Sequence, residues 1–352
     1  SGLTPRAMAV LEKARGIEIK GDGKSSSSSG DKKGGGANET KEVKQMLKTM
    51  ILGVKTVVWS VSNSRMTVHQ PHPMTGAVGG PVQSLQKGMS EGECLLVARL
   101  LNSGLECFAI YNQGPEASAQ EEKDVLDYFA GVFTVLDVRN FTQVFQLQMT
   151  FLYARVLQNN TMSTMLQHFL ANSTVSRSFA DILLTFLVER IEALGSPEEP
   201  QAAVLLRLFK LVFGSITLFP ENEPLLRPHL STIVTQAMRH AAHAAQPSNY
   251  FSLLRALFKS IGGGKFEQLY KEFLPLLPTL LQGLIGAHAA SHQPQVKELL
   301  LELCLTLPAR LSSLLPYLHM LMRPVLHALR ASQELVSLAL RTLEFWIDHL
   351  HP

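Results

Sequence analysis

Two histidine pairs have spacings that suit metal binding. His240 and His243 lie three residues apart in a segment with helical periodicity, so both side chains would project from one face of a helix. His69 and His72, in the stretch HQPHP, fall in a segment whose composition predicts a loop. Neither pair has a third ligand at a suitable spacing, and the sequence contains no HExxH motif. We interpret the first pair as exposed or partly buried helix residues and the second as ordinary loop residues.

Two glycine–lysine junctions invite comparison with phosphate-binding loops. Lys24 and Ser25 follow a glycine, but Glu18 stands where the spacing GxxxxGK[ST] requires the first glycine, and no strand is expected before it. Lys265 follows three glycines but has no Ser or Thr after it. We therefore predict no nucleotide site at either position, and we expect the second junction to be a turn between helices.

Nucleophiles and carboxylates give no catalytic pattern either. The three cysteines are far apart and form no CxxC motif, which argues for a reducing compartment; they are Cys94, Cys107 and Cys304. The motif GxGxxG is absent, and the stretch GMSEG at 88–92, which has the spacing GxSxG, contains the serine of a predicted helix cap, so we expect no catalytic serine there. Four glutamates gather at the end of one predicted helix and the start of the next, where structural placement explains them: Glu189, Glu192, Glu198 and Glu199. We predict no catalytic, cofactor-binding or metal-binding residue, and the partner-binding residues remain unassigned.

Aromatic side chains recur at helical spacing and would line a groove or fill a core. The positions are Phe141, Phe145 and Phe151, then Phe179, Phe186 and Leu187, and finally the two tryptophans, Trp59 and Trp346. A groove for a partner helix is the functional alternative. We expect core packing for all of them, because apolar stripes on helices usually face a core.

The elements that would hold these residues are helices almost throughout. Apolar residues recur at steps of three and four, and alternation typical of strands is nearly absent. Ser90 and Glu93 have the spacing of a capping box, and the glycines 262–264 end a helix. We predict helices over 4–14, 41–60, 90–111, 119–135, 137–157, 161–171, 175–194, 198–218, 222–243, 248–261, 265–288, 294–307, 311–330 and 333–349.

Internal repetition defines the fold. The segment LSTIVTQAM at 230–238 aligns with LLPTLLQGL at 276–284 and LMRPVLHAL at 321–329, with offsets of 46 and 45 residues. Such spacing is typical of HEAT repeats, in which antiparallel helix pairs stack on one another. Prolines in the first helix of each pair are expected to kink it; they are Pro228, Pro275 or Pro278, and Pro324. We predict an all-α, HEAT-type α-solenoid.

Composition sets the domain boundaries and excludes several classes of protein. Of the 352 residues 46% are apolar and 17% charged, and the net charge is only +3, so a large core is expected and a nucleic-acid groove is not. Residues 273–290 lack charged side chains but contain prolines and polar residues, so we expect no membrane span.

We divide the chain into a short helix of a preceding repeat (1–16), a flexible Gly/Ser linker (17–40), a helix (41–61), a loop (62–89) and a solenoid (90–352). Because a helix without a polar cap ends the sequence, we expect an excerpt of a longer protein.

Several segments resemble the HEAT region of the TRRAP family. They are RALFKSIGGG (255–264), EFLPLLP (272–278), ELCLTLP (302–308), RLSSLLPYL (310–318), LRTLE (340–344) and KTMILGVKTVVW (48–59). The resemblance is dense over 250–352, thinner over 90–249 and absent from the Gly/Ser linker.

The resemblance implies a nuclear scaffold without catalysis. Members of this family are pseudokinases of the phosphatidylinositol-3-kinase-related group, with the kinase-like domain far C-terminal to such a segment. They are subunits of histone acetyltransferase complexes such as SAGA, and their solenoid binds acidic activation domains of transcription factors. We expect no cofactor, no direct nucleic-acid contact and no membrane. The alternatives are a HEAT-repeat nuclear transport receptor and a HEAT regulatory subunit of a phosphatase or kinase.

Overall fold

The computed structural model describes residues 45–46, 49–60, 89–111, 119–196 and 199–350. Within these ranges all regular structure is helical, which confirms the all-α prediction. The helix expected at 4–14, the linker at 17–40 and nearly all of the loop at 62–89 lie outside the described residues. The chain forms two compact units, Ser1–Val175 and Ser176–Pro352, which are described in turn.

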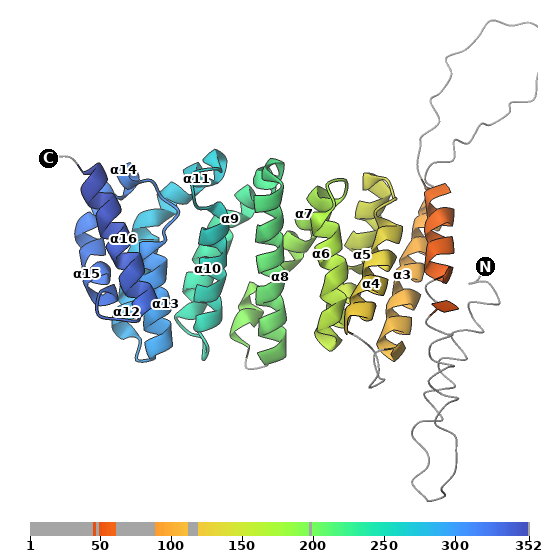
Figure 1. Cartoon of the computed structure of the whole chain (residues 1–352), viewed down its shortest axis with the longest axis horizontal. Helices are drawn as coiled ribbons and strands as arrows, with labels where there is room; N and C mark the ends of the chain where they lie inside the picture. The colour runs from red at the N-terminus through yellow and green to blue at the C-terminus, as the bar shows by residue number, and fades with distance from the viewer. Residues whose placement is uncertain (1–44, 47–48, 61–88, 112–118, 197–198, 351–352) are drawn as a thin grey trace, which may run out of the picture. The chain divides into compact units, whose positions relative to one another are not determined.

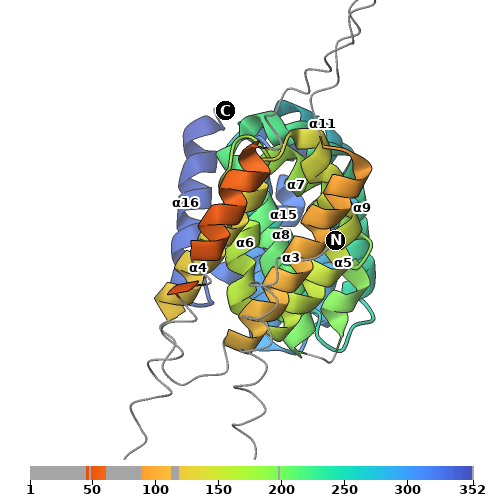
Figure 2. The same cartoon turned by 90° about the vertical axis from the view of Figure 1, so that its right-hand side faces the viewer.

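The first unit is built from helices that pack in alternation. After the helix Thr49–Ser60, α3 packs against α5 and α4 against α6. Figure 2 shows this unit from the side of the helix Thr49–Ser60, drawn in orange-red. The bounds are α3 Glu91–Tyr111, α4 Ala119–Phe133, α5 Val138–Gln158, the 3₁₀ turn η1 Asn160–Met162 and α6 Ser163–Ala171.

Polar side chains fix where two of these helices begin. The backbone N–H of Ser90 donates to Glu93 Oε2 at 2.7 Å, and the N–H of Glu93 donates to Ser90 Oγ at 3.4 Å, so the predicted capping box is confirmed. Asp137 caps α5 by accepting from the amides of Arg139 and Asn140 at 3.0 and 3.1 Å. These contacts satisfy amides that the first turn of a helix leaves without partners.

Phenylalanines form the core of the first unit. Phe133 meets Phe145 edge to face at a centroid distance of 5.7 Å, and Phe141 meets Phe169 at 5.4 Å. These four rings have no exposed surface. Burying each one stabilises the fold by about 1.5–3 kcal/mol, and the edge-to-face geometry adds to that.

The second unit contains the longest run of regular helix pairs. Its elements are α7 Ser176–Val188, η2 Ile191–Gly195, α8 Glu199–Leu218, η3 Pro220–Asn222, α9 Glu223–Ala241, α10 Ser248–Ile261, α11 Glu267–Phe273, η4 Leu274–Leu276, α12 Leu277–Ala290, α13 Pro294–Leu305, α14 Leu311–Leu314, η5 Leu315–Tyr317, α15 Leu318–Ala328 and α16 Gln333–His349.

Helix pairs in this unit follow the predicted repeat. α9 packs on α10, α12 on α13 and α15 on α16. The second helices of the pairs also contact one another in series, α8 with α10, α10 with α13 and α13 with α16 (Figure 1). Pairs that touch only their neighbours are the defining feature of a solenoid, so the HEAT-type architecture is confirmed.

Prolines break the first helices of the pairs more sharply than we predicted. A 3₁₀ turn containing Pro275 divides the expected helix 265–288 into α11 and α12, and a turn containing Pro316 divides 311–330 into α14 and α15. A proline has no N–H to donate and its ring crowds the preceding turn. Pro228 and Pro324, in contrast, lie inside continuous helices. The expected helix 175–194 is also shorter, because α7 ends at Val188 and η2 follows.

Polar contacts between neighbouring repeats recur at the repeat spacing. Glu223, the first residue of α9, accepts hydrogen bonds from the amides of Gln268 and Leu269 at the start of α11, at 2.7 and 3.0 Å. Glu267, the first residue of α11, contacts Arg310 just before α14. A carboxylate at the start of one first helix therefore serves the start of the next, and opposes the partial positive charge there.

The turn between α10 and α11 uses the conformational freedom of glycine. Gly263 and Gly264 have φ values of +79° and +74°, in the left-handed region where other residues are strained. This confirms the predicted interhelical turn at 262–264 and explains the glycines without a phosphate site.

Candidate functional site

The histidine candidates for a metal site do not converge. His240 is half-buried and stacks on the ring of Tyr250 at a centroid distance of 5.9 Å, whereas His243 is exposed at the end of the same segment. Among the described residues, no three His, Cys, Asp or Glu side chains lie close enough to hold a metal ion. His69 and His72 lie outside the described residues, as do Lys24 and Ser25.

The thiols of the two buried cysteines are poor nucleophiles. Burial raises the pKa of Cys304 to about 12, so this thiol is protonated at neutral pH. Burial also raises the pKa of Cys94, and the nearby carboxylates of Asp137 and Glu93 raise it further. A protonated, buried thiol reacts slowly, so we interpret Cys94 and Cys304 as residues that fill the core.

The glutamates singled out in the sequence have structural surroundings. Glu189 pairs with Arg190 at 3.2 Å, and the backbone carbonyl of Glu192 accepts a hydrogen bond from the phenol of Tyr250. α8 begins at Glu199, as the position of the acidic pair predicted. Glu198 lies outside the described residues.

Most aromatic candidates belong to the core. Phe179, Phe186 and Leu187 are buried, as are Phe141, Phe145 and Trp346, so the core prediction is confirmed for them. Phe151 is half-buried instead, and the guanidinium of Arg155 lies over its ring at 4.9 Å.

Trp59 is a correction to the sequence prediction. Its side chain is 55% exposed, next to exposed Leu52 and Val57. Ile51 and Val58, seven residues apart and thus on one helix face, turn inward in its place. The apolar run around Trp59 covers both sides of its helix, so periodicity could not identify the buried side.

A groove lies between α8 and α10. It has a volume of about 380 Å³ and is lined by Lys210, Phe213, Gly214, Ser252, Arg255, Ala256, Lys259 and Ser260. The two helices run in parallel and end side by side, because Thr217, next to the last residue of α8, donates from Oγ1 to the carbonyl of Ser260, next to the last residue of α10, at 3.4 Å. The lining includes small residues from both helices, which leave space between them.

The rim of this groove is basic. Lys210 is exposed, and the side chains of Arg255 and Lys259 are 38% and 63% exposed. Both α10 cations pair with Glu302 of α13, at 3.1 and 3.2 Å. Sequence analysis missed this site, although the signal was present: α8 and α10 carry four basic residues and, after Glu199, no acidic one.

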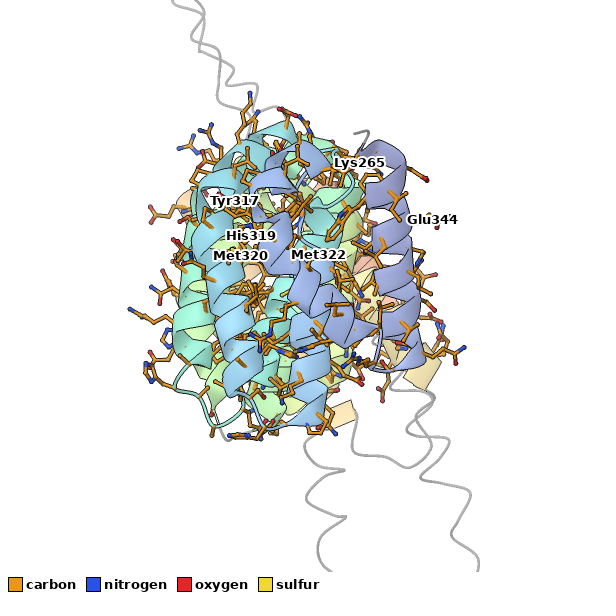
Figure 3. The ribbon with its side chains drawn as sticks, turned by 90° about the vertical axis from the view of Figure 1, so that its left-hand side faces the viewer. Lys265, Tyr317, His319, Met320, Met322 and Glu344 are labelled. Atoms are coloured by element: carbon orange, nitrogen blue, oxygen red, sulfur yellow. The ribbon has the colours of Figure 1, made fainter. Side chains whose placement is uncertain are left out.

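The last helix pair has an exposed apolar face. Met322 and Leu326 of α15 are 41% and 52% exposed. Figure 3 presents this face, with His319 and Met322 toward the viewer and Glu344 at the edge formed by α16. One repeat earlier, Leu277 and Leu281 occupy the equivalent positions and are covered. The face therefore has the composition of an interface between repeats.

Within the described residues, two helical segments are long and apolar enough to cross a membrane by length and composition: Pro200–Leu218, and Glu267–Ala290, which comprises α11, η4 and α12. Each buries its apolar side against neighbouring repeats, for α8 packs on α7 and α10, and α12 on α13. Core helices of a repeat protein pass the same test, so this is weak evidence for a membrane.

Comparison with known proteins identifies the repeats. The family model described as Tra1 HEAT repeat central region matches residues 4–352. Transformation/transcription domain-associated protein of Homo sapiens is 41% identical over 327 residues, which cover 88% of this chain. Transcription-associated protein 1 of Drosophila melanogaster is 42% identical over 323 residues, also 88% of this chain. The SAGA complex/NuA4 acetyltransferase complex subunit TRA1 of Saccharomyces cerevisiae is 40% identical over 237 residues, or 67% of this chain.

The similarity spans a small part of these relatives. The chain covers 8% of the human and fly proteins and 6% of the yeast protein. It extends along nearly the whole of this chain, however, and includes the repeats whose packing is described above. The chain belongs to the Tra1 family, within the central HEAT-repeat region.

Proposed function

We propose that this chain is a non-catalytic scaffold segment of a transcription co-activator, a nuclear subunit of a SAGA-like histone acetyltransferase complex. Its work is to bind other subunits of the complex and acidic activation domains of transcription factors through its helical surfaces. No bond is made or broken in this mechanism, and no cofactor is needed.

The observation that carries the proposal is the combination of stacked helix pairs with open surfaces. The described residues offer a basic groove, whereas their histidines, cysteines and carboxylates are dispersed or structurally engaged. Relatives named as SAGA and NuA4 acetyltransferase complex subunits support the same role. Function is thus argued from the surfaces, since the fold alone hosts many functions.

Affinity purification of the full-length protein from nuclear extract tests the proposal. We expect acetyltransferase-complex subunits and histone acetyltransferase activity to co-purify. Recovery of a small GTPase with cargo would indicate the transport-receptor alternative, and recovery of a phosphatase would indicate the regulatory-subunit alternative. Either result without acetyltransferase subunits would overturn the scaffold proposal.

A further inference from the structure

We propose that the groove between α8 and α10 is the docking site for an acidic peptide segment of a partner protein. In this arrangement carboxylates of the peptide pair with Lys210, Arg255 and Lys259, and an apolar side chain of the peptide lies on the groove floor. The inference rests on the proposed function, because it assigns a site to the binding of partners.

The shape of the groove suits a peptide. Small residues line it from both helices: Gly214 belongs to α8, and Ser252 and Ser260 lie one turn to either side of Ala256 in α10. A Cβ atom added at Gly214 would meet no other atom within 4 Å, so the space above this residue is open. A volume of about 380 Å³ accommodates a few side chains and is far too small for a folded domain. The apolar part of the lining, which we call the groove floor, consists of the buried Phe213 together with Ala256.

Charge selects an acidic ligand. Lys210 of α8 and Arg255 and Lys259 of α10 line the groove, while neither helix carries an acidic residue after Glu199. Lys210 forms no ion pair with any described residue. A carboxylate bound beside it would gain a partner without displacing one, and partly desolvated pairs of this kind are stronger than fully exposed ones.

Glu302 shows how the groove would bind a carboxylate. One of its oxygens, Oε2, accepts from Arg255 at 3.1 Å, and the other, Oε1, contacts Lys259 Nζ at 3.2 Å. The side chain of Glu302 is only 21% exposed, so the two cations converge on a partly buried carboxylate supplied by α13. Glu302 therefore competes with an incoming acidic side chain for the same two cations.

The same features argue against a nucleic acid as the ligand. A nucleic-acid backbone requires a track of cations, and affinity comes mostly from phosphate contacts. Here three cations surround an apolar floor, and a carboxylate already occupies two of them. An apolar floor within a basic rim is complementary to a peptide that alternates acidic and apolar residues.

Fluorescence anisotropy of the full chain with a labelled peptide of alternating aspartate and leucine residues tests the site. We expect Lys210→Glu to weaken binding by about tenfold or more, because it replaces attraction by repulsion at the rim. Arg207→Glu is the matched control: it has the same charge change on the same helix, outside the groove lining, and we expect less than about a threefold effect. Gly214→Leu, which fills the groove without changing charge, should also weaken binding.

Glu302→Gln gives a prediction of opposite sign. Removal of the internal carboxylate frees Arg255 and Lys259, so the peptide should bind about threefold more tightly or better. Glu298→Gln, exposed on the same helix, should leave the affinity unchanged.

Equal weakening by Lys210→Glu and Arg207→Glu would overturn the proposal, because it would mean that only overall charge matters. Tighter binding of duplex DNA than of the peptide, lost in the Lys210→Glu variant, would also overturn it in favour of a nucleic-acid site.

The outcome can be separated from that of the proposed function. Full-length protein with Lys210→Glu should still co-purify acetyltransferase subunits while losing the acidic peptide. If the unmodified protein does not recover those subunits, the scaffold proposal itself fails, whatever the peptide does. Circular dichroism of each variant confirms that the helices are retained.

Discussion

The phenol of Tyr250 donates a 2.6 Å hydrogen bond to the backbone carbonyl of Glu192, which lies 58 residues earlier in the chain. Tyr250 is 1% exposed and belongs to the first turn of α10, whereas Glu192 belongs to the 3₁₀ turn η2. The contact joins one helix pair to the preceding one. Burial raises the pKa of this phenol, so it remains a donor at all physiological pH values.

Tyr250→Phe should lower the free energy of unfolding by about 1–2 kcal/mol, because the carbonyl of Glu192 loses its buried donor while the ring remains in place. Urea unfolding followed by circular dichroism measures the change. Tyr317→Phe is the control, since the hydroxyl of Tyr317 makes no hydrogen bond to a described residue, and its effect should stay within about 0.5 kcal/mol. Equal effects of the two substitutions would contradict the role of the Glu192 contact.

The carboxylate of Glu223 caps the next repeat, so Glu223→Ala should destabilise the second unit by about 1 kcal/mol. Loss of protection should appear first at the amides of Gln268 and Leu269 in hydrogen exchange, because they lose their acceptor. Glu221→Ala removes an equal charge from an exposed position two residues earlier. Faster exchange of both amides in that control as well would mean that charge, and not the cap, protects them.

Close packing of α3 on α4 gives a steric prediction. A Cβ atom at Gly104 would lie 2.2 Å from Cζ of Phe129, so Gly104→Ala should destabilise the first unit by about 1–3 kcal/mol. Gly92→Ala, near the start of the same helix, would meet nothing within 4 Å and should be neutral or slightly stabilising. Thermal melting of the two variants decides the matter: a melting temperature for Gly104→Ala at or above that of Gly92→Ala would contradict this packing.

Acid should weaken the contact between α12 and α15. The imidazole of His288 lies 5.1 Å from that of His327, and burial lowers the pKa of His288, with further lowering by the charges of His327, Lys297 and Arg323. The unfolded chain therefore binds a proton at a higher pH than the folded chain does. Stability should fall as the pH drops below about 6.5 and level off below the lowered pKa of the folded state.

His288→Gln should reduce this loss of stability, as measured by urea unfolding at a series of pH values. Part of the pH dependence of the free energy of unfolding should persist, because burial also lowers the pKa of His229. The charge of Asp181 opposes this lowering. His319→Gln, on the exposed face of α15, serves as the comparison. If the free energy of unfolding changes with pH in the same way for His288→Gln and for the unmodified chain, protonation of His288 does not contribute to the loss of stability.

Sequence patterns identified the helices well because each one carries local signals. The capping box at Ser90, the glycines after Ile261 and the apolar stripe of α10 all act within a few residues of chain. The repeat offset found in the sequence reappears in the contact between Glu223 and Leu269, 46 residues apart. Helix ends and the repeat length of a solenoid can therefore be predicted directly from the sequence.

Features that depend on three dimensions were harder to find. The division of α14 from α15 at Pro316 was missed because prolines also lie inside continuous helices here, as Pro324 does. The burial of Trp59 was predicted wrongly because its helix is apolar on more than one side. The groove is lined by Gly214 and Ala256, which lie 42 residues apart in the sequence, and only the packing of α8 on α10 brings them to one surface.

The cap that Glu223 places on the next repeat has a consequence for how such chains change over time. Glu223 binds backbone amides, and every amino acid except proline supplies the same amide. This junction between repeats therefore depends little on which side chains the incoming repeat carries at the two capped positions. Duplication, loss or exchange of whole units between related genes could leave such a joint intact, so a long array can be lengthened or reshuffled while its surfaces diverge toward new partners.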